Sequence, residues 1–151
     1  MGTMRAEATH TVAVPPAVVF ACLADFAHHA QFLPPAFSNF SVVSGGIGAG
    51  TLVRFTVTAG GRNRNYEMEV SEPEPGRVLV ETDKNSSLVT TFTVDPDATG
   101  ARVTISTTWQ SAATGVGGFF EKRFAPLAMA RIYQDELRRL EAYAKQQVAS
   151  A

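Results

Sequence analysis

Few side chains in this sequence have the chemistry of metal ligands or nucleophiles, and their spacing argues against both roles. The chain of 151 residues contains three histidines and a single cysteine. His28 and His29 are adjacent, so on a helix their side chains diverge by about 100° and cannot share a metal ion. Cys22 has no base beside it, and we expect it to pack as a small helix residue. The sequence therefore predicts neither a metal site nor a cofactor.

Three further polar side chains fall where periodicity predicts an apolar face. We interpret His10 as a satisfied core or rim histidine, with a polar contact or a general base at a cavity as the functional alternative. By alternation, Arg64 shares an inward face with Tyr66 and Met68. A lone arginine among apolar residues needs an anion or a carbonyl, so we favour an internal salt bridge or a rim position over a ligand contact. Arg131, one turn beyond an apolar helix position, has the same two interpretations.

The sequence contains no recognisable catalytic motif. A nucleophile elbow, a paired-carboxylate motif and a Ser/His/Asp arrangement cannot be placed. The glycine-rich run 45–50 precedes an alternating strand and contains no lysine, whereas phosphate loops open a helix. We therefore interpret this run as a hairpin turn, and the catalytic residues stay unassigned.

The elements that must position these side chains begin with one strand and two short helices. Alternation predicts a strand over residues 6–14. Prolines 15–16 end this strand and favour the first turn of a helix that includes Val18 and Cys22. Asp25 is a candidate cap for a second helix over residues 26–32.

From residue 37 onward the hydrophobic period becomes two, as in β-strands. Alternation and turn residues predict strands over 37–44, 51–59, 62–72, 77–83, 88–95 and 101–109. Gly60-Gly61 lies between two of them and is typical of a two-residue hairpin turn, which needs positive φ. Short strands joined by tight turns predict an antiparallel sheet.

Each predicted strand has one apolar face and one polar face. The apolar faces, which we expect to point inward, include Phe55, Tyr66, Met68, Val78, Val80, Phe92 and Trp109. The polar faces, which we assign to solvent, include Glu67, Glu69, Glu81 and Asp83. A one-sided sheet has to bury its apolar face against a partner.

The partner is a helix predicted over residues 117–147. Its main apolar line consists of Phe119, Pro126, Ala130, Tyr133, Leu137, Leu140 and Ala144. A shorter second line consists of Phe120, Phe124 and Leu127. The helix would be about 45 Å long, and a sheet of six or seven strands is about 30 Å wide, so it can cross the whole sheet. Pro126 predicts a kink that follows the sheet, which we favour over the hinge of a gate.

Composition excludes several kinds of partner. A net charge of −1 without a basic run argues against nucleic acid, and a hydrophobic content of 45% supports the core of one domain. One cysteine excludes an intrachain disulfide and fits a reducing compartment. No apolar run reaches the roughly 18 to 20 residues that span a bilayer. The first residues lack the apolar core of a signal peptide, so we expect a cytoplasmic protein.

The order of these elements resembles the START-like superfamily (SRPBCC, Bet v 1-like). Within it, the chain resembles the polyketide cyclase/dehydrase and lipid transport families. The residues that carry this resemblance are runs 15–20, 25–34 and 48–51 together with the terminal helix, and it covers residues 5–147 as one domain. The resemblance implies an α+β helix-grip fold. In this fold a seven-stranded antiparallel sheet wraps around the C-terminal helix, and an apolar cavity lies between them.

The leading hypothesis for function is a binder or carrier of a small hydrophobic ligand such as a lipid or a polyketide. The alternative is an enzyme of the polyketide cyclase or dehydratase type, in which Arg64, Tyr66 and His10 would assist enolisation or dehydration. A protein-interaction module is a weaker third hypothesis, and the chain could form a homodimer. The residues we expect to contact ligand are His10, Phe55, Arg64, Tyr66, Met68, Phe92, Trp109, Phe120, Phe124, Arg131 and Tyr133.

Overall fold

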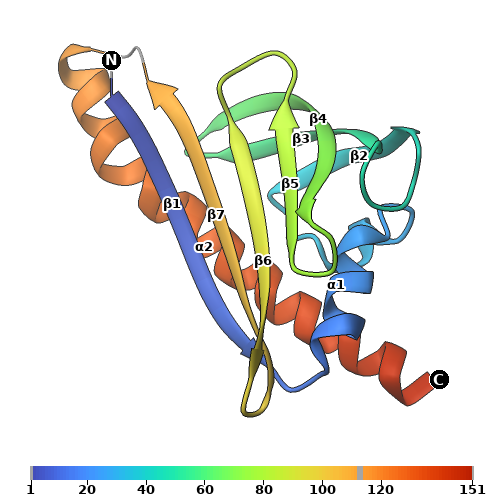
Figure 1. The fold of residues 1–151 in the computed structure, drawn as a ribbon. Helices are drawn as coiled ribbons and strands as arrows, with labels where there is room; N and C mark the ends of the chain where they lie inside the picture. The colour runs from blue at the N-terminus through green and yellow to red at the C-terminus, as the bar shows by residue number, and fades with distance from the viewer. Residues whose placement is uncertain (1, 112–113, 151) are drawn as a thin grey trace.

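The structure is a computed structural model that describes residues 2–111 and 114–150, apart from the side chains of residues 119, 120 and 122. Its elements follow the predicted order (Figure 1). They are β1 (Gly2–Val12), α1 (Pro16–Ala24), the 3-10 helix η1 (His29–Phe32), β2 (Phe37–Ser44), β3 (Leu52–Ala59), β4 (Arg62–Glu74), β5 (Val78–Asp83), β6 (Val89–Asp97), β7 (Gly100–Ser111) and α2 (Gly115–Ser150).

The strands form one sheet of seven, in the order β1-β7-β6-β5-β4-β3-β2, and every pair is antiparallel. The predicted seven-stranded antiparallel sheet is therefore confirmed. Gly60 and Gly61 join β3 to β4 with φ of 60° and 75°, the positive values that a two-residue hairpin turn requires. Shifts of register interrupt the pairing of β2 with β3 and of β4 with β5. Such irregularities bend strands and increase their twist, which lets the sheet curve around a helix.

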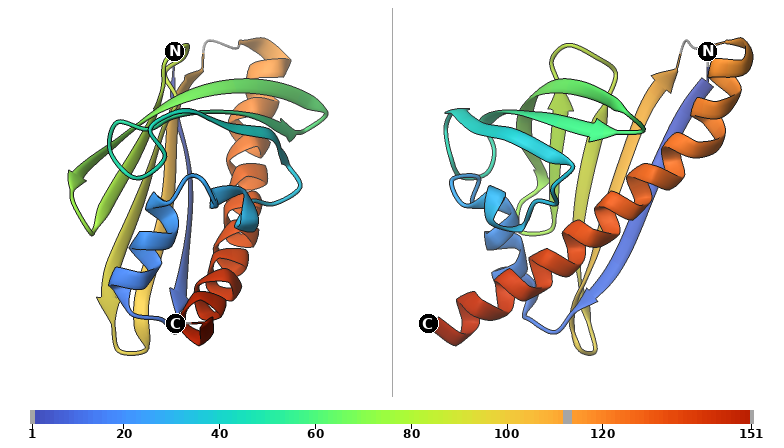
Figure 2. Two further views of the ribbon diagram at one scale, coloured as in Figure 1. Left: turned by 90° about the vertical axis from the view of Figure 1, so that its right-hand side faces the viewer. Right: turned by 180° about the vertical axis from the view of Figure 1, so that it is seen from behind.

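Helix α2 spans 36 residues and continues through Pro126, so the proline does not divide it. The right-hand view of Figure 2 shows α2 crossing in front of the sheet, from a start beside the β1 edge to an end near α1. Along its second half the predicted inward line is buried, and Leu137, Leu140 and Ala144 are fully enclosed. The helix-grip arrangement predicted from the sequence is confirmed.

The first turns of α2 differ from the prediction. Phe124 and Leu127, on the second apolar line, are 50% and 55% exposed. These turns lie beside the edge strand β1 and not over the middle of the sheet (Figures 1 and 2), so the sheet offers them less surface to pack against. The second apolar line predicted for this helix is therefore not buried at Phe124 and Leu127.

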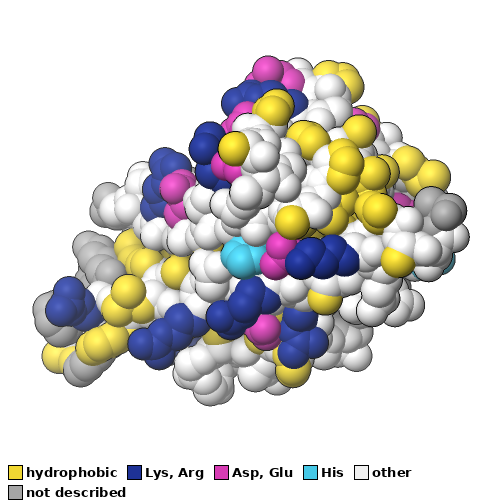
Figure 3. All heavy atoms as spheres, turned by 90° about the horizontal axis from the view of Figure 1, so that it is seen from below, with side chains coloured by type: hydrophobic (Ala, Val, Ile, Leu, Met, Phe, Trp, Pro, Cys, Tyr) yellow, Lys and Arg dark blue, Asp and Glu magenta, His cyan; other side chains and the backbone are white. Residues whose placement is uncertain are grey.

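The outward side of α2 is basic. Arg123, Arg131, Arg138, Arg139 and Lys145 are all exposed. Figure 3, which views the molecule from below, shows Lys and Arg side chains at intervals along the lower margin, where α2 lies. The helix therefore has one buried face and one solvated face, as an amphipathic helix should.

The second predicted helix is shorter than expected. Only His29–Phe32 is helical, as a single 3-10 turn. The Asp25 carboxylate lies 2.8 Å from Nδ1 of His28 and does not cap a longer helix. Pro34 follows closely, and the residue before a proline is disfavoured in a helix.

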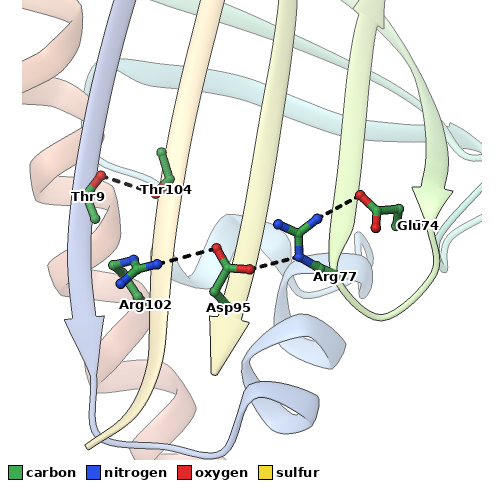
Figure 4. A network of polar contacts seen from close by, with 6 residues as sticks. All are labelled: Thr9, Glu74, Arg77, Asp95, Arg102 and Thr104. Atoms are coloured by element: carbon green, nitrogen blue, oxygen red, sulfur yellow. Dashed lines mark hydrogen bonds and ion pairs between the residues drawn. The ribbon is translucent and has the colours of Figure 1, made fainter. Parts of the chain in front are cut away.

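The convex face of the sheet is polar and crosslinked. Figure 4 shows Arg77, in the turn before β5, between Glu74 of β4 and Asp95 of β6, at 2.7 and 2.8 Å. Arg102 of β7 adds a longer ion pair of 3.8 Å to the same Asp95. This face is exposed to solvent, so an enclosed site for a ligand has to lie on the concave face, under α2.

The face assignment of β5 is wrong. Leu79, Glu81 and Asp83 are buried, whereas Val78 and Val80 are only half-buried. Leu79 pairs with Phe92 and Glu81 pairs with Thr90, and cross-strand partners share a face, so this phase of β5 points inward. The first three residues of the strand are all apolar, so alternation cannot distinguish its two faces. Burial of Asp83 is compensated, because its carboxylate accepts hydrogen bonds from the Glu67 backbone and the Ser86 hydroxyl.

Candidate ligand-binding cavity

A cavity lies between the concave face of the sheet, η1 and α2. The described residues that line it are His29, Leu33, Phe37, Phe40, Phe55, Val57, Tyr66, Met68, Glu81, Leu88, Thr90, Phe92, Met129, Tyr133 and Glu136. The empty space of the cavity is about 470 Å³ when the part open to solvent is included. The volume within which the centre of a water molecule can move is much smaller, about 30 Å³. One water needs roughly 10 to 15 Å³ by this measure. A larger guest therefore requires side chains at the border of the cavity to turn outward.

Five of the residues that we expected to contact a ligand belong to this lining. They are Phe55, Tyr66, Met68, Phe92 and Tyr133. The first four come from β3, β4 and β6, where alternation places them on the inward face, and Tyr133 comes from the buried line of α2. The periodicity argument thus brings these side chains from four elements to one enclosed space.

Five other expected residues lie outside the described lining. Arg64 is exposed near the start of β4, although its charge still acts on the Tyr66 hydroxyl. Arg131 and Phe124 are exposed on α2, and Trp109 is half-buried near the end of β7. His10 is discussed next, and the Phe120 side chain is outside the described part of the structure.

His10 connects β1 to the second half of α2. Its Nε2 lies 3.0 Å from a carboxylate oxygen of Glu141, and the other oxygen of Glu141 accepts a hydrogen bond from the Ala13 backbone. The hydrogen bond with His10 is the main reason that the pKa of Glu141 lies below its usual range. His10 therefore connects the strand to the helix and is not among the described residues that line the cavity.

His29 is the histidine that reaches the cavity. It is 2% exposed and stacks between Phe26 and Phe40, with ring centroids 4.9 and 5.8 Å apart. Nδ1 lies 3.1 Å from the Leu23 carbonyl oxygen, and a carbonyl only accepts, so Nδ1 carries the proton and Nε2 is an acceptor. Burial lowers the pKa of His29 to about 4, so the ring is neutral at pH 7.

A chain of buried hydroxyl groups crosses from the sheet to the helix. Thr90 of β6 and Thr107 of β7 are hydrogen-bonded at 2.7 Å, and Thr107 is hydrogen-bonded in turn to the Tyr133 hydroxyl. Burial raises the pKa of Tyr133 well above its ordinary value. Tyr133 is therefore a neutral hydrogen-bonding group at pH 7, and this chain holds it in place.

Two carboxyl groups lie in the same region. Glu81 of β5 is 5% exposed and Glu136 of α2 is 2% exposed. Burial raises the pKa of Glu81 to about 8. Burial also raises the pKa of Glu136 well above its usual value, and the nearby charge of Glu81 raises it further. Burial therefore favours the protonated form of both groups while nothing positively charged is bound near them.

Sequence reasoning missed His29, Glu81, Thr90 and Glu136 as members of the lining. Glu136 had a visible signal, since it lies three residues after Tyr133 and one before Leu137, within the helical spacing of the buried line. Glu81 had a weaker signal, because only the pairing with β6 decides which phase of β5 is inward. The spacing of His28 and His29 addresses only a shared metal ion, so it gives no signal that His29 lines a cavity. Among the described residues, no group of three or more His, Cys, Asp or Glu side chains could hold a metal.

A curved antiparallel sheet, a long helix against its concave face and a cavity between them define a helix-grip protein of the START-like superfamily. The chain belongs to the polyketide cyclase/dehydrase and lipid transport family, whose model matches residues 3–145. Comparison with curated proteins gives no match. No helix in the described ranges is long and apolar enough to cross a membrane.

Several solved structures are similar over nearly their whole length. The KanY protein (ms6282) is 36% identical, with a TM-score of 0.84 over 96% of this chain and 99% of that one. The Zhui aromatase/cyclase from Streptomyces sp. R1128 is 18% identical, with a TM-score of 0.77 over 97% and 96% of the two chains. Ara h 8.0201 is 16% identical, with a TM-score of 0.63 over 96% and 99%. At this low identity the last two show a shared fold alone.

Proposed function

We propose that this protein binds or carries a small hydrophobic ligand in the cavity between its sheet and α2. The observation that carries the proposal is the composition of the wall. Aromatic and aliphatic side chains such as Phe40, Phe55 and Met68 enclose a space that a few polar atoms border. Binding sites for small molecules have this pattern of apolar lining with isolated orienting groups. Membership of a family described by polyketide cyclisation and lipid transport supports the same proposal.

Entry of a ligand requires the cavity to widen. Leu33, Phe37, Leu88 and Met129 belong to the lining and are only half-buried, so they mark its more open border. Methionine and leucine change rotamer readily at such positions, and methionine adapts its shape to its neighbours. Outward rotation of these side chains is the opening step that we propose.

The test compares two substitutions on adjacent residues of β3. Val57→Phe adds a ring on the cavity side, whereas Thr58→Phe adds the same ring on the exposed side. Binding of the neutral dye Nile red, followed by its fluorescence, should weaken at least severalfold in Val57→Phe and stay unchanged in Thr58→Phe. Equal binding by both variants and the wild-type protein would place the dye elsewhere and refute the proposal.

An enzyme of the cyclase or dehydratase type is the second candidate. One cavity holds a neutral imidazole acceptor, His29, and two carboxyl groups, Glu81 and Glu136, whose burial favours the protonated form. An acceptor and a donor of protons are what enolisation and loss of water require. An acyl thioester of a short poly-β-ketone should then give a cyclised or dehydrated product with wild-type protein and less product with Glu136→Gln. Product formation at the uncatalysed rate would reject this candidate for that substrate class.

A further inference from the structure

The cavity has an acidic character that its apolar walls do not explain. Its described lining includes the two carboxyl groups of Glu81 and Glu136 and contains no lysine or arginine. The other titratable groups that face them are His29 of η1, Tyr66 of β4 and Tyr133 of α2, and none is a cation at pH 7. Asp83, the next inward residue on β5, is already hydrogen-bonded.

Neither carboxyl group has a partner within the described part of the protein. No hydrogen bond or ion pair joins Glu81 or Glu136 to any described residue, although both are more than nine-tenths buried. Every fully enclosed side-chain nitrogen or oxygen of the described residues has a hydrogen-bond partner. The unpartnered oxygens of Glu81 and Glu136 therefore border the cavity. Burying polar groups in this way is costly, and the cost persists until a guest supplies hydrogen-bonding or charged partners.

The surrounding rings favour one sign of charge. The faces of aromatic rings are electronegative and attract cations, and more strongly where water is excluded. Ring contacts join four lining residues in series: Phe55 to Phe40, Phe40 to His29, and His29 to Phe92. The ring centroids are 6.3 Å apart in the Phe40–Phe55 and His29–Phe92 pairs. An anionic guest would meet electronegative ring faces and carboxyl oxygens with no fixed cation in the described lining to balance its charge.

We propose that the ligand is a protonated amine on an apolar body, and that its ammonium group binds Glu81 and Glu136 while the apolar body lies against the aromatic wall. This inference rests on the proposed function, since it names the chemical class of the hydrophobic ligand. An ammonium group has three donors and no acceptor, which matches two carboxyl groups once they have released their protons. Binding of the cation favours the ionised carboxyl groups, so protons leave the protein as the amine enters.

The experiment uses three ligands of one shape: 4-phenylbutylamine, 4-phenylbutanol and 4-phenylbutanoate. Calorimetric titration at pH 7 should give an amine affinity about tenfold or more above that of the alcohol, with the carboxylate weakest. Repeating the amine titration in buffers of different ionisation enthalpy should reveal release of about one proton per amine bound. Amine affinity should rise between pH 6 and pH 8.

Variants separate the carboxyl groups from the rest of the wall. Glu81→Gln and Glu136→Gln keep the side-chain shape and should each reduce the ratio of amine affinity to alcohol affinity by about tenfold. Glu7→Gln changes an exposed carboxylate paired with Arg5 on β1 and should change neither affinity. Melting temperatures at or above that of the wild-type protein would show that the variants fold.

The possible outcomes lead to different conclusions. Equal binding of amine and alcohol, or an amine preference that survives both glutamine substitutions, would overturn the amine proposal and leave apolar binding intact. Stronger binding of 4-phenylbutanoate would also overturn it. Failure of all three ligands and of Nile red to bind would refute the proposed function itself, and the amine proposal with it.

Discussion

At the scale of single residues, the pocket depends on polar groups that are buried for different reasons. Thr90, Thr107 and Tyr133 satisfy one another, whereas Glu81 and Glu136 face the cavity without a partner. The first group should contribute to stability, since each member would be unsatisfied without the others. The second group should reduce stability in the absence of a ligand. Substitutions can measure this difference directly.

Thr107→Val keeps the shape of the side chain and removes the hydroxyl that joins Thr90 to Tyr133. We expect the free energy of unfolding to fall by about 1 to 3 kcal/mol, because two buried groups lose a partner. Urea unfolding followed by circular dichroism measures the change. Thr104→Val is the matched control on the same strand, where the hydroxyl pairs with Thr9 in an exposed position, and it should cost less than about 0.5 kcal/mol. Equal losses for both variants would contradict the buried chain.

Glu81 should make stability depend on pH. Its pKa rises from 4.5 to about 8 on folding, so the folded protein keeps a proton that the unfolded chain releases. This contribution is complete below pH 4.5 and is lost as the pH rises to about 8. Glu136 acts in the same direction. His29 acts in the opposite direction, because its pKa falls from 6.5 to about 4, and its contribution is lost as the pH falls through that range.

Glu81→Gln should therefore flatten the decline in stability between pH 6.5 and pH 8. At pH 8 we expect the variant to be more stable than the wild-type protein by roughly 2 to 4 kcal/mol, as removal of a buried unpaired acid predicts. Urea unfolding over a series of pH values tests this. Glu69→Gln, which changes an exposed carboxylate on the outer face of β4, should follow the wild-type profile. A profile for Glu81→Gln that matches the wild-type profile would show that Glu81 is ionised and solvated.

At the scale of elements, the contact between β1 and α2 is held by the His10–Glu141 pair. Both side chains are partly buried, and Glu141 also binds the Ala13 backbone. Glu141→Gln should cost about 0.5 to 1.5 kcal/mol in unfolding free energy and increase hydrogen exchange in the last turns of α2. Asp135→Asn breaks only the exposed pair with Arg139 on the same helix and should cost at most about 0.5 kcal/mol. The reverse order would contradict the proposed anchoring role.

The elements themselves were largely predictable from the sequence, and their faces were predictable only where the pattern was clear. Alternation such as Val53-x-Phe55-x-Val57 and the line from Tyr133 to Ala144 placed both sides of the cavity correctly. It failed for β5, where Val78, Leu79 and Val80 are apolar in both phases and the neighbouring strand decides the register. It also failed for Phe124, because exposure there depends on how far α2 extends past the sheet.

At the scale of the whole molecule, the account depends on one claim: an apolar guest enters the space between the sheet and α2. The chain offers natural reporters, because two of its four methionines, Met68 and Met129, line the cavity from opposite sides. Met4 is buried on β1, outside the described lining, and serves as an internal control.

The most direct measurement is a two-dimensional carbon–proton NMR titration of protein labelled at the methionine methyl groups. The ligands are 4-phenylbutanol and 4-phenylbutylamine. The account predicts saturable shifts of the Met68 and Met129 signals with both ligands, larger than any shift of Met4, and saturation at lower concentration for the amine. Val57→Phe should weaken the response, and Thr58→Phe should not. Unchanged Met68 and Met129 signals at saturating ligand, or shifts confined to Met4, would contradict the account.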